Sequence, residues 1–327
     1  MKNIKSQNIW NLVLGIYLGF SILGLGFKVF AQENDLFLVV SPSSPAPNQG
    51  YSVEAKSYQF DASRAYFEWF KDGKKIDEGN GITQKTFSGE KLGAQTKIIA
   101  VTVGNSASAQ INVNDIDFII NPLAYTPPFY RGSPLPTSGS VVEIYTVPHI
   151  HSGGSRISPQ NLIFEWTLDG NPIREQSGKG KNKFIFALPK TFLGVNEVTL
   201  KASSLNGAIS HEKRFIVEMR RPEIILYKQS SLLGKSALAF SSFETKSGEE
   251  FAVAAEPFFF DIDSLFHSTL SWFTNGSKIS SGQEQNPFLL ELSSQSGSES
   301  ENNISFKIEN EKNVFQKGEG KINIKIK

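Results

Sequence analysis

Three stretches of similar sequence decide the fold: YFEWFKDGKKI at 66–76, IFEWTLDGNPI at 163–173 and TLSWFTNGSKI at 269–279. Each stretch places a tryptophan two residues after an apolar residue, then an Asp-Gly or Asn-Gly pair, then an isoleucine. Alternate residues of a β-strand face the same side, and Asp-Gly and Asn-Gly pairs close tight hairpins. Each stretch therefore predicts a strand, a turn and the start of another strand.

The tryptophans of these stretches recur at the interval of one small domain. Trp69, Trp166 and Trp272 lie 97 and 106 residues apart, which is close to the roughly 100 residues of an immunoglobulin-sized sandwich. We expect each indole to fill the space between two facing sheets. These three side chains are the predicted structural core residues.

A second predicted strand follows each tryptophan at a nearly constant distance. Alternating apolar residues begin at Ile99, Val198 and Ile304, which lie 30, 32 and 32 positions after their tryptophans. In the first of these strands, the expected buried face also includes Val101 and Val103. Such alternation is typical of a strand with one buried face.

The pattern as a whole predicts an all-β chain. No long segment with a helical period follows the first 31 residues, and short alternating runs are separated by turn residues. That combination favours sandwiches of antiparallel strands. The predicted fold is three tandem β-sandwiches after an N-terminal hydrophobic helix.

These motifs carry a family resemblance. The string W-x-x-D-G-x-x-I resembles strand C and the following turn of the Ig-like superfamily, and LGVNEVTLKA at 193–202 resembles the approach to strand F in PKD-like repeats. The chain thus resembles PKD-like or bacterial Ig-like tandem repeats, which implies surface modules for spacing, adhesion or assembly. It departs from antibody-type domains, because it has no cysteine and no evident tyrosine corner.

Composition shifts divide the chain into four parts. The predicted parts are an N-terminal segment at 1–31 and Ig-like modules at 35–114, 115–219 and 222–327. The sequence Arg220-Arg221-Pro222 indicates a proline-stiffened hinge between the last two modules. Five prolines between 121 and 140 exclude a central strand there, and we expect an extended arm along a sheet edge.

The first 31 residues have the pattern of an export signal or of a membrane anchor. Lys2 and Lys5 precede 22 residues without a charge, from Ser6 to Phe27. A charged start before an apolar run is typical of a signal peptide, and cleavage is then expected after Ala31. About 20 such residues also suffice to span a bilayer. Both interpretations leave the N-terminus inside and place the other residues outside the cytoplasm.

Composition argues against several classes of function. Lys plus Arg is 33 and Asp plus Glu is 32, so the net charge of +1 gives no general attraction for nucleic acid. The absence of cysteine excludes disulfides and thiol chemistry. No nucleophile elbow, phosphate-binding loop or zinc-protease motif is present. We therefore predict a protein that is not an enzyme, with no catalytic, cofactor or metal site and no nucleic-acid partner.

A few residues have the spacing of metal ligands. His149 and His151 share one face if their strand is regular, but no carboxylate is near them in sequence, so surface or loop histidines are the prediction. Two acidic pairs leave calcium dependence open, although two acids are too few for its six or more oxygen ligands. These pairs are Asp115 with Asp117 and Asp261 with Asp263.

The leading functional hypothesis is a non-enzymatic, extracytoplasmic modular surface protein. It would act as a spacer, an adhesion module or an assembly scaffold through sheet edges and loops, with a protein or glycan partner at the cell surface and with membrane contact through an uncleaved N-terminal segment. The alternative is a carbohydrate- or peptidoglycan-binding protein with Tyr125, Phe129 and Tyr130 as an aromatic platform. Residues 258–260 are predicted as a buried strand, with an exposed partner patch as the alternative.

Overall fold

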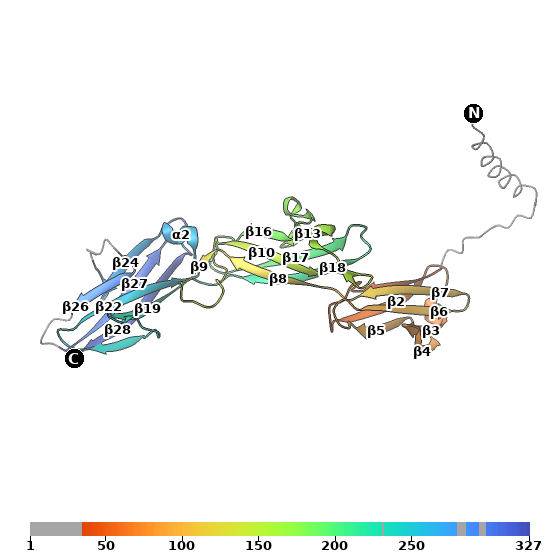
Figure 1. Ribbon diagram of the computed structural model, residues 1–327, viewed down its shortest axis with the longest axis horizontal. Coiled ribbons are helices and arrows are strands. Elements are labelled where there is room, and N and C mark those ends of the chain that lie inside the picture. The colour runs from red at the N-terminus through yellow and green to blue at the C-terminus, as the bar shows by residue number, and fades with distance from the viewer. Residues whose placement is uncertain (1–34, 231, 280–285, 294–298) are drawn as a thin grey trace, which may run out of the picture.

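The computed structural model describes residues 35–230, 232–279, 286–293 and 299–327, and the regular secondary structure of this part of the chain is almost entirely β-strand. The all-β prediction is therefore confirmed. Figure 1 shows two-layered sandwiches arranged end to end, with the C-terminus in the last one. The predicted N-terminal helix and the expected cleavage site at Ala31 lie outside the described residues. Within the described ranges, no helix is long and apolar enough to cross a membrane.

The first sandwich faces a three-stranded sheet against a four-stranded sheet. The smaller sheet has the order β1-β2-β5, with β1 (Leu36–Ser41), β2 (Gly50–Ser57) and β5 (Gln84–Ser88). The larger has the order β4-β3-β6-β7, with β3 (Tyr66–Lys71), β4 (Lys74–Asn80), β6 (Gln95–Thr102) and β7 (Asn105–Asn112). A 3₁₀ turn, η1 (Ala62–Arg64), precedes β3.

The second sandwich repeats this arrangement. Its smaller sheet has the order β16-β10-β8, with β8 (Asp115–Pro122), β10 (Val141–His149) and β16 (Lys183–Ala187). Its larger sheet has the order β14-β13-β17-β18, with β13 (Leu162–Leu168), β14 (Asn171–Pro172), β17 (Val195–Ser204) and β18 (Ser210–Glu218). The short elements are β9 (Ala124–Tyr125), β11 (His151–Ser152), β12 (Ser155–Arg156), β15 (Gly178–Lys179), η2 (Pro159–Asn161) and η3 (Arg174–Gln176).

The third sandwich has the same core order with two added strands. One sheet has the order β20-β19-β22-β26, with β19 (Glu223–Ser230), β20 (Gly234–Lys235), β22 (Glu250–Phe258) and β26 (Leu289–Ser293). The other has the order β21-β28-β27-β24-β25, with β21 (Ser242–Thr245), β24 (Thr269–Thr274), β25 (Ser277–Lys278), β27 (Ser300–Glu309) and β28 (Lys317–Ile326). The short β23 (Phe260–Asp261) leads into α2 (Ile262–Phe266).

Each sandwich encloses its own hydrophobic core. The buried residues of the three core clusters fall between Leu36 and Ile111, between Ile116 and Met219, and between Ile224 and Ile324. One tryptophan lies in each cluster: Trp69, Trp166 and Trp272 are 0%, 1% and 4% exposed. Burying a side chain of this size contributes a large share of each core's apolar area.

The N–H group of each buried indole also has a hydrogen-bond acceptor. The indole N–H donates to a backbone carbonyl, over 2.7 Å from Trp69 to Ile82, 3.0 Å from Trp166 to Lys181 and 3.0 Å from Trp272 to Pro287. A buried donor without an acceptor would cost about 1–3 kcal/mol. In every sandwich, the tryptophan is therefore hydrogen-bonded to the segment that immediately precedes the fifth core strand.

The Asp or Asn of the repeated motif has a structural task of its own. Asp72, Asp169 and Asn275 adopt left-handed backbone with φ of 49°, 50° and 49°, a region that Asp and Asn tolerate better than most residues. Their side-chain oxygens accept hydrogen bonds from backbone N–H groups of the sixth strand: from Lys97 at 2.7 Å, Glu197 at 2.7 Å and Asn303 at 2.9 Å. Each turn is thereby fastened to the central strand of its sheet.

One predicted strand face is wrong. In β6 the buried residues are Thr96, Ile98 and Ala100, and Ala100 is paired with Trp69. The expected core residue Val103 is 90% exposed. Residues 98–101 are all apolar, so the sequence pattern leaves the register open, and a shift of one residue moves every side chain to the other face.

Candidate functional site

The first joint, between the first and second sandwiches, is a buried polar network. Asn114 is 0% exposed; its Nδ2 donates to the Ser44 hydroxyl at 2.8 Å, and its Oδ1 accepts from the backbone N–H of His151 at 2.9 Å. The Ser44 hydroxyl donates to the Asn112 carbonyl at 3.0 Å. Buried polar groups are costly unless they are paired, so this network favours one relative placement of the two sandwiches.

His211 of the second sandwich completes the first joint. Its Nδ1 lies 2.8 Å from the backbone carbonyl of Ser44, and its ring is 5% exposed. Burial lowers the pKa of His211, against the opposing effects of the Ser44 carbonyl and the Asp115 carboxylate. Asp115 lies 3.8 Å from His211 Nε2 and 2.9 Å from Lys213 Nζ. At neutral pH, an uncharged imidazole donates from Nδ1 to Ser44.

The second joint, between the second and third sandwiches, contains a similar network of buried amides. Gln316 is fully buried; its Nε2 donates to Thr137 Oγ1 at 3.1 Å and to the Ser138 carbonyl at 2.7 Å, while its Oε1 accepts from the Asp261 N–H at 3.0 Å. Asn313 Nδ2 donates to the same Ser138 carbonyl at 3.0 Å. Loops of two sandwiches are thus bonded through side chains that water does not reach.

Strand pairing also crosses the second joint. In β9, Tyr125 and Ala124 pair with Phe260 and Asp261 of β23, and the Phe259 N–H donates to the Tyr125 carbonyl at 2.7 Å. We expected the proline-rich arm to run along a sheet edge; instead, it reaches the third sandwich. The prolines prevent a long ladder but permit this two-residue pairing. The joint is therefore partly a β-sheet.

Aromatic rings fill the outer side of this joint. The Tyr130 ring meets those of Phe258 and Phe259 edge-on, with centroids 5.5 and 5.8 Å apart. Phe129 meets Tyr227 edge-on at 5.8 Å. Residues 258–260 are 5%, 8% and 0% exposed, so their predicted burial is confirmed and they offer no exposed patch. They are not one continuous strand as predicted, because Phe259, with a φ of 61°, separates the end of β22 from the start of β23.

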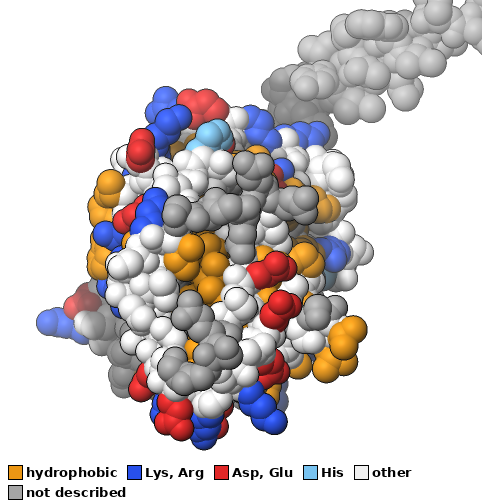
Figure 2. Space-filling model, turned by 90° about the vertical axis from the view of Figure 1, so that its left-hand side faces the viewer, with side chains coloured by type: hydrophobic (Ala, Val, Ile, Leu, Met, Phe, Trp, Pro, Cys, Tyr) orange, Lys and Arg blue, Asp and Glu red, His pale blue; other side chains and the backbone are white. Residues whose placement is uncertain are grey.

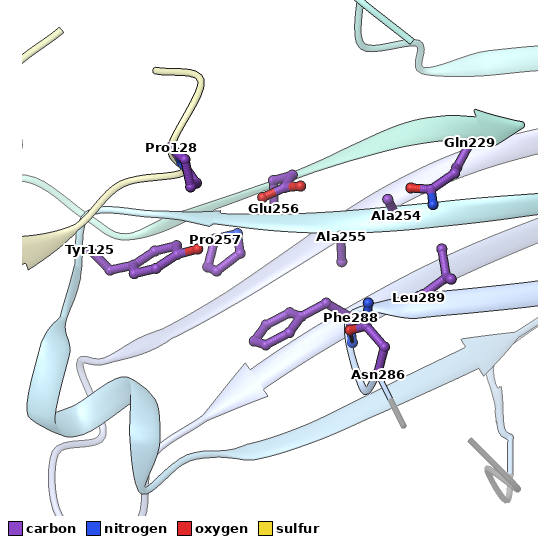
Figure 3. Close-up of a pocket in the computed structure, with 10 residues that line it drawn as sticks. All are labelled: Tyr125, Pro128, Gln229, Ala254, Ala255, Glu256, Pro257, Asn286, Phe288 and Leu289. Carbon is purple, nitrogen blue, oxygen red and sulfur yellow. Dashed lines mark hydrogen bonds between the residues drawn. The ribbon is translucent and has the colours of Figure 1, made fainter. Parts of the chain in front are cut away.

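A cavity of about 250 Å³ opens where the proline arm meets the third sandwich (Figure 3). Tyr125 and Pro128 of the arm form one end, and Gln229 of β19 lies toward the other. Asn286 and Phe288 line the side next to β26. The cavity therefore depends on the second joint, because residues of two sandwiches build it.

The predicted aromatic platform is only partly brought to this cavity. Tyr125 lines it, whereas Phe129 and Tyr130 pack against rings of the third sandwich. Phe129 keeps 46% of its surface exposed, with Lys235 Nζ 3.8 Å from its ring centroid. The three side chains thus do not form one flat surface.

The histidine pair is used for structure. His149 Nε2 lies 3.0 Å from Asp117 Oδ2, and His151 Nδ1 lies 3.1 Å from the His149 carbonyl. Asp117 lies on the neighbouring strand β8, 32 positions from His149, so their proximity is not visible in the sequence. Among the described residues, no group of three or more His, Asp or Glu side chains could hold a metal ion.

The two acidic pairs also have partners. Asp115 bonds to Lys213, as described above, and Asp261 caps α2 by accepting from the Ser264 N–H at 2.9 Å. Asp263 lies 3.6 Å from His267. The two pairs are therefore engaged in ionic and capping contacts.

The sequence predictions missed the residues that define the joints and the cavity. Gln316 and Asn313 lie in a turn near the C-terminus, 178 and 175 positions from their common partner Ser138. Gln229 lies near the end of β19, two residues after the apolar run 224–227. Polar residues of this kind resemble those of any solvated loop, and only the packing of one sandwich on another makes them buried.

The strand order identifies the architecture. In all three sandwiches the first, second and fifth core strands form one sheet, and the fourth, third, sixth and seventh form the other. This is the immunoglobulin arrangement, with the fourth strand beside the third as in variable-type domains. The chain is a tandem of Ig-like β-sandwiches.

Comparison with known proteins adds little to the Ig-like assignment. No family model and no curated protein sequence matches the chain. Among solved structures, it is similar to the Bacteroides ovatus mixed-linkage glucan utilization locus protein SGBP-B in complex with a mixed-linkage heptasaccharide. That match has 11% identity and a TM-score of 0.26 and covers 87% of this chain and 65% of that one.

Two further matches are themselves Ig-like or phage surface tandems. Extracellular domains 3–5 of Drosophila OTK match at 13% identity and TM-score 0.24, covering 87% of this chain and 94% of that one. The three N-terminal domains of the bacteriophage RB49 outer capsid protein Hoc match at 11% and 0.23, covering 89% and 98%. Likenesses this weak say nothing about what an Ig-like chain binds.

Proposed function

We propose that this chain is a non-enzymatic, extracytoplasmic surface protein whose Ig-like sandwiches form a stiff spacer. The proposed modules are 35–114, 115–219 and 222–327, and the proposed anchor or export signal is 1–31. PKD-like repeats are the proposed subgroup. The proposal rests on the two joints, where buried polar networks and a strand pair hold neighbouring sandwiches in one arrangement.

The spacer is proposed to bind partners through its sheet edges and loops. The edge strand β16 is closed to such contacts, because the Gln176 side chain occupies the backbone groups of Ile185 in its middle. The Gln176 amide donates to the Ile185 carbonyl at 2.7 Å and accepts from the Ile185 N–H at 2.8 Å. Within residues 35–230, no side-chain amide bonds in this way to the backbone of β5, the corresponding strand of the first sandwich. Exposed backbone groups on an edge can pair with a partner strand, so β5 is the proposed edge.

Location and processing can be tested on intact cells. Protease added outside should cut the sandwiches at their loops if they are extracytoplasmic. The N-terminal residue of the mature protein separates the two interpretations of the first segment: Glu33 or Gln32 indicates cleavage near Ala31, and Met1 indicates an anchor. Full protection from the protease would contradict the extracytoplasmic location.

Carbohydrate binding is the second candidate function. The observation in its favour is the cavity at the second joint, which combines aromatic and amide side chains. Aromatic faces and paired donors and acceptors are what a sugar ring with its hydroxyl groups requires. Binding to a panel of immobilised glycans tests carbohydrate binding. The absence of binding to every glycan would contradict this candidate function and leave the spacer proposal intact.

A further inference from the structure

Two polar groups in the joint cavity lack hydrogen-bond partners among the described residues. They are the hydroxyl of Tyr125 and the side-chain amide of Gln229, and both residues are half-buried. Figure 3 shows the Tyr125 hydroxyl directed toward Glu256 and Pro257. Half-buried polar groups gain from a bonding partner. The cavity therefore presents two unused bonding groups along its length.

The tyrosine is held in its donor form. Burial raises the pKa of Tyr125, and the negative charge of Glu256 raises it further. The hydroxyl therefore keeps its proton and can donate to an acceptor in the cavity. The amide of Gln229 can both donate and accept. A ligand with many hydroxyl groups satisfies both groups at once.

The cavity continues into a larger hollow over the outer face of the third sandwich. The hollow has a volume of about 910 Å³ and shares Gln229 and Leu289 with the cavity. The small side chain of Ala252 also lines it. Together, the two spaces form a groove, which we call the joint groove, with the volume to hold a chain of linked units.

The charges of the joint groove disfavour anions. Its lining contains two lysines and four glutamates: Lys228, Lys235, Glu249, Glu250, Glu256 and Glu291. Lys235 is paired with Glu256, and its ammonium also lies 3.8 Å from the centroid of the Phe129 ring. The net charge of the lining is therefore negative, which repels phosphate and carboxylate groups. Figure 2, which views the outer end of this sandwich, likewise shows acidic side chains beside hydrophobic ones.

The position of the joint groove also disfavours an added peptide strand. β22 runs through the sheet with β19 on one side and β26 on the other. The ladder with β19 covers residues 252–258 and the ladder with β26 covers residues 250–254. Over residues 252–254, where both ladders are present, a peptide lying on the sheet would find no free backbone partners, so recognition there must come from side chains.

We propose that the joint groove binds an uncharged oligosaccharide chain. Tyr125 and Gln229 bond to its hydroxyl groups, and the apolar surfaces of Pro128 and Phe288 contact the faces of its rings. This assignment rests on the second candidate function and names its site and ligand class. Because the groove spans the second joint, binding also holds the second and third sandwiches together.

The test uses the full-length chain in detergent on an array of uncharged hexasaccharides of glucose, N-acetylglucosamine, xylose and mannose. At least one of them binds, and Tyr125→Phe and Gln229→Ala each weaken that binding about five- to tenfold, since each removes one hydrogen bond. Neither variant should lower the melting temperature, because the removed groups have no partner within the described residues. Tyr145→Phe is the matched control on the second sandwich, and its binding is unchanged.

Two results would overturn the proposal. One is the absence of binding to every hexasaccharide, or binding that neither variant weakens. The other is binding of a lysine-rich decapeptide in place of the sugars, which would assign the acidic groove to a basic protein partner. Scattering from the unliganded chain tests the spacer separately, so failure of the sugar assignment leaves that proposal standing.

Discussion

Replacing Gln316 tests whether the buried amides hold the second joint. The side chain makes three hydrogen bonds, two of them to the second sandwich, and is fully buried. In Gln316→Ala, the Ser138 carbonyl keeps its bond from Asn313, but Thr137 and the Asp261 N–H lose a partner. Each lost bond costs about 1 kcal/mol, and the Asp261 N–H, left without an acceptor, adds a further penalty. The free energy of unfolding should therefore fall by about 3–4 kcal/mol.

Calorimetry of residues 35–327 measures this loss. For a sandwich of about 100 residues, 3 kcal/mol corresponds to a fall of roughly 12–20 °C in melting temperature. We expect the third sandwich to unfold earlier by about that amount and its transition to separate from that of the second. Gln110→Ala, a surface amide of the first sandwich, should move no transition by more than about 2 °C.

A conservative replacement sharpens the result. Gln316→Glu keeps the size of the side chain but removes both N–H donors and buries a carboxylate. It should destabilise the joint as much as alanine at pH 7 and less at pH 4, where the protonated acid can donate one bond. A melting profile of Gln316→Ala that matches the unmodified chain would refute the claim that the amide network holds the joint.

Three further outcomes follow. Asp169→Ala removes the acceptor of the Glu197 N–H and of Asn196 Nδ2 and places alanine at a positive φ, so denaturant unfolding should show a loss of about 2 kcal/mol or more, whereas Asp169→Asn should lose much less. Because burial lowers the pKa of His211 in the folded chain, the unfolded chain binds the proton more tightly; joint stability is complete above about pH 6.5 and declines below it. His211→Asn should therefore flatten the fall in melting temperature between pH 7 and pH 5, and an unaltered slope would count against the buried imidazole as its cause. Adding a calcium chelator should leave every transition in place, since the acidic pairs already have partners; a drop of several degrees would show a bound ion.

The sequence predicts the sandwiches well because their determinants are local. A tryptophan, a turn pair and an isoleucine within eleven residues specify a strand, a hairpin and a core position, and the asparagine or aspartate of that motif has the same bonds in all three copies. The error in β6 arose where residues 98–101 are apolar on both faces, so that alternation could not choose between Ile98 and Ile99.

The joints and the joint groove could not be predicted in the same way. Asn114 and Gln316 owe their roles to hydrogen-bond partners far along the chain, and Gln229 owes its role to the residues of another sandwich that close the cavity beside it. No local pattern separates such amides from solvated ones. The proline-rich arm shows the same limit: its prolines excluded a central strand, but its pairing with Phe260 depends on where the third sandwich begins.

Small-angle scattering of residues 35–327 tests most directly whether the sandwiches form a stiff rod. With strands of 8–10 residues and a rise of about 3.3 Å per residue, three sandwiches end to end extend about 80–100 Å, which gives a radius of gyration of roughly 25–30 Å. We predict that value, with a single sharp maximum length that is unchanged by salt. A radius near 19 Å, which is typical of a compact fold of about 290 residues, or a broad distribution of lengths, would contradict it.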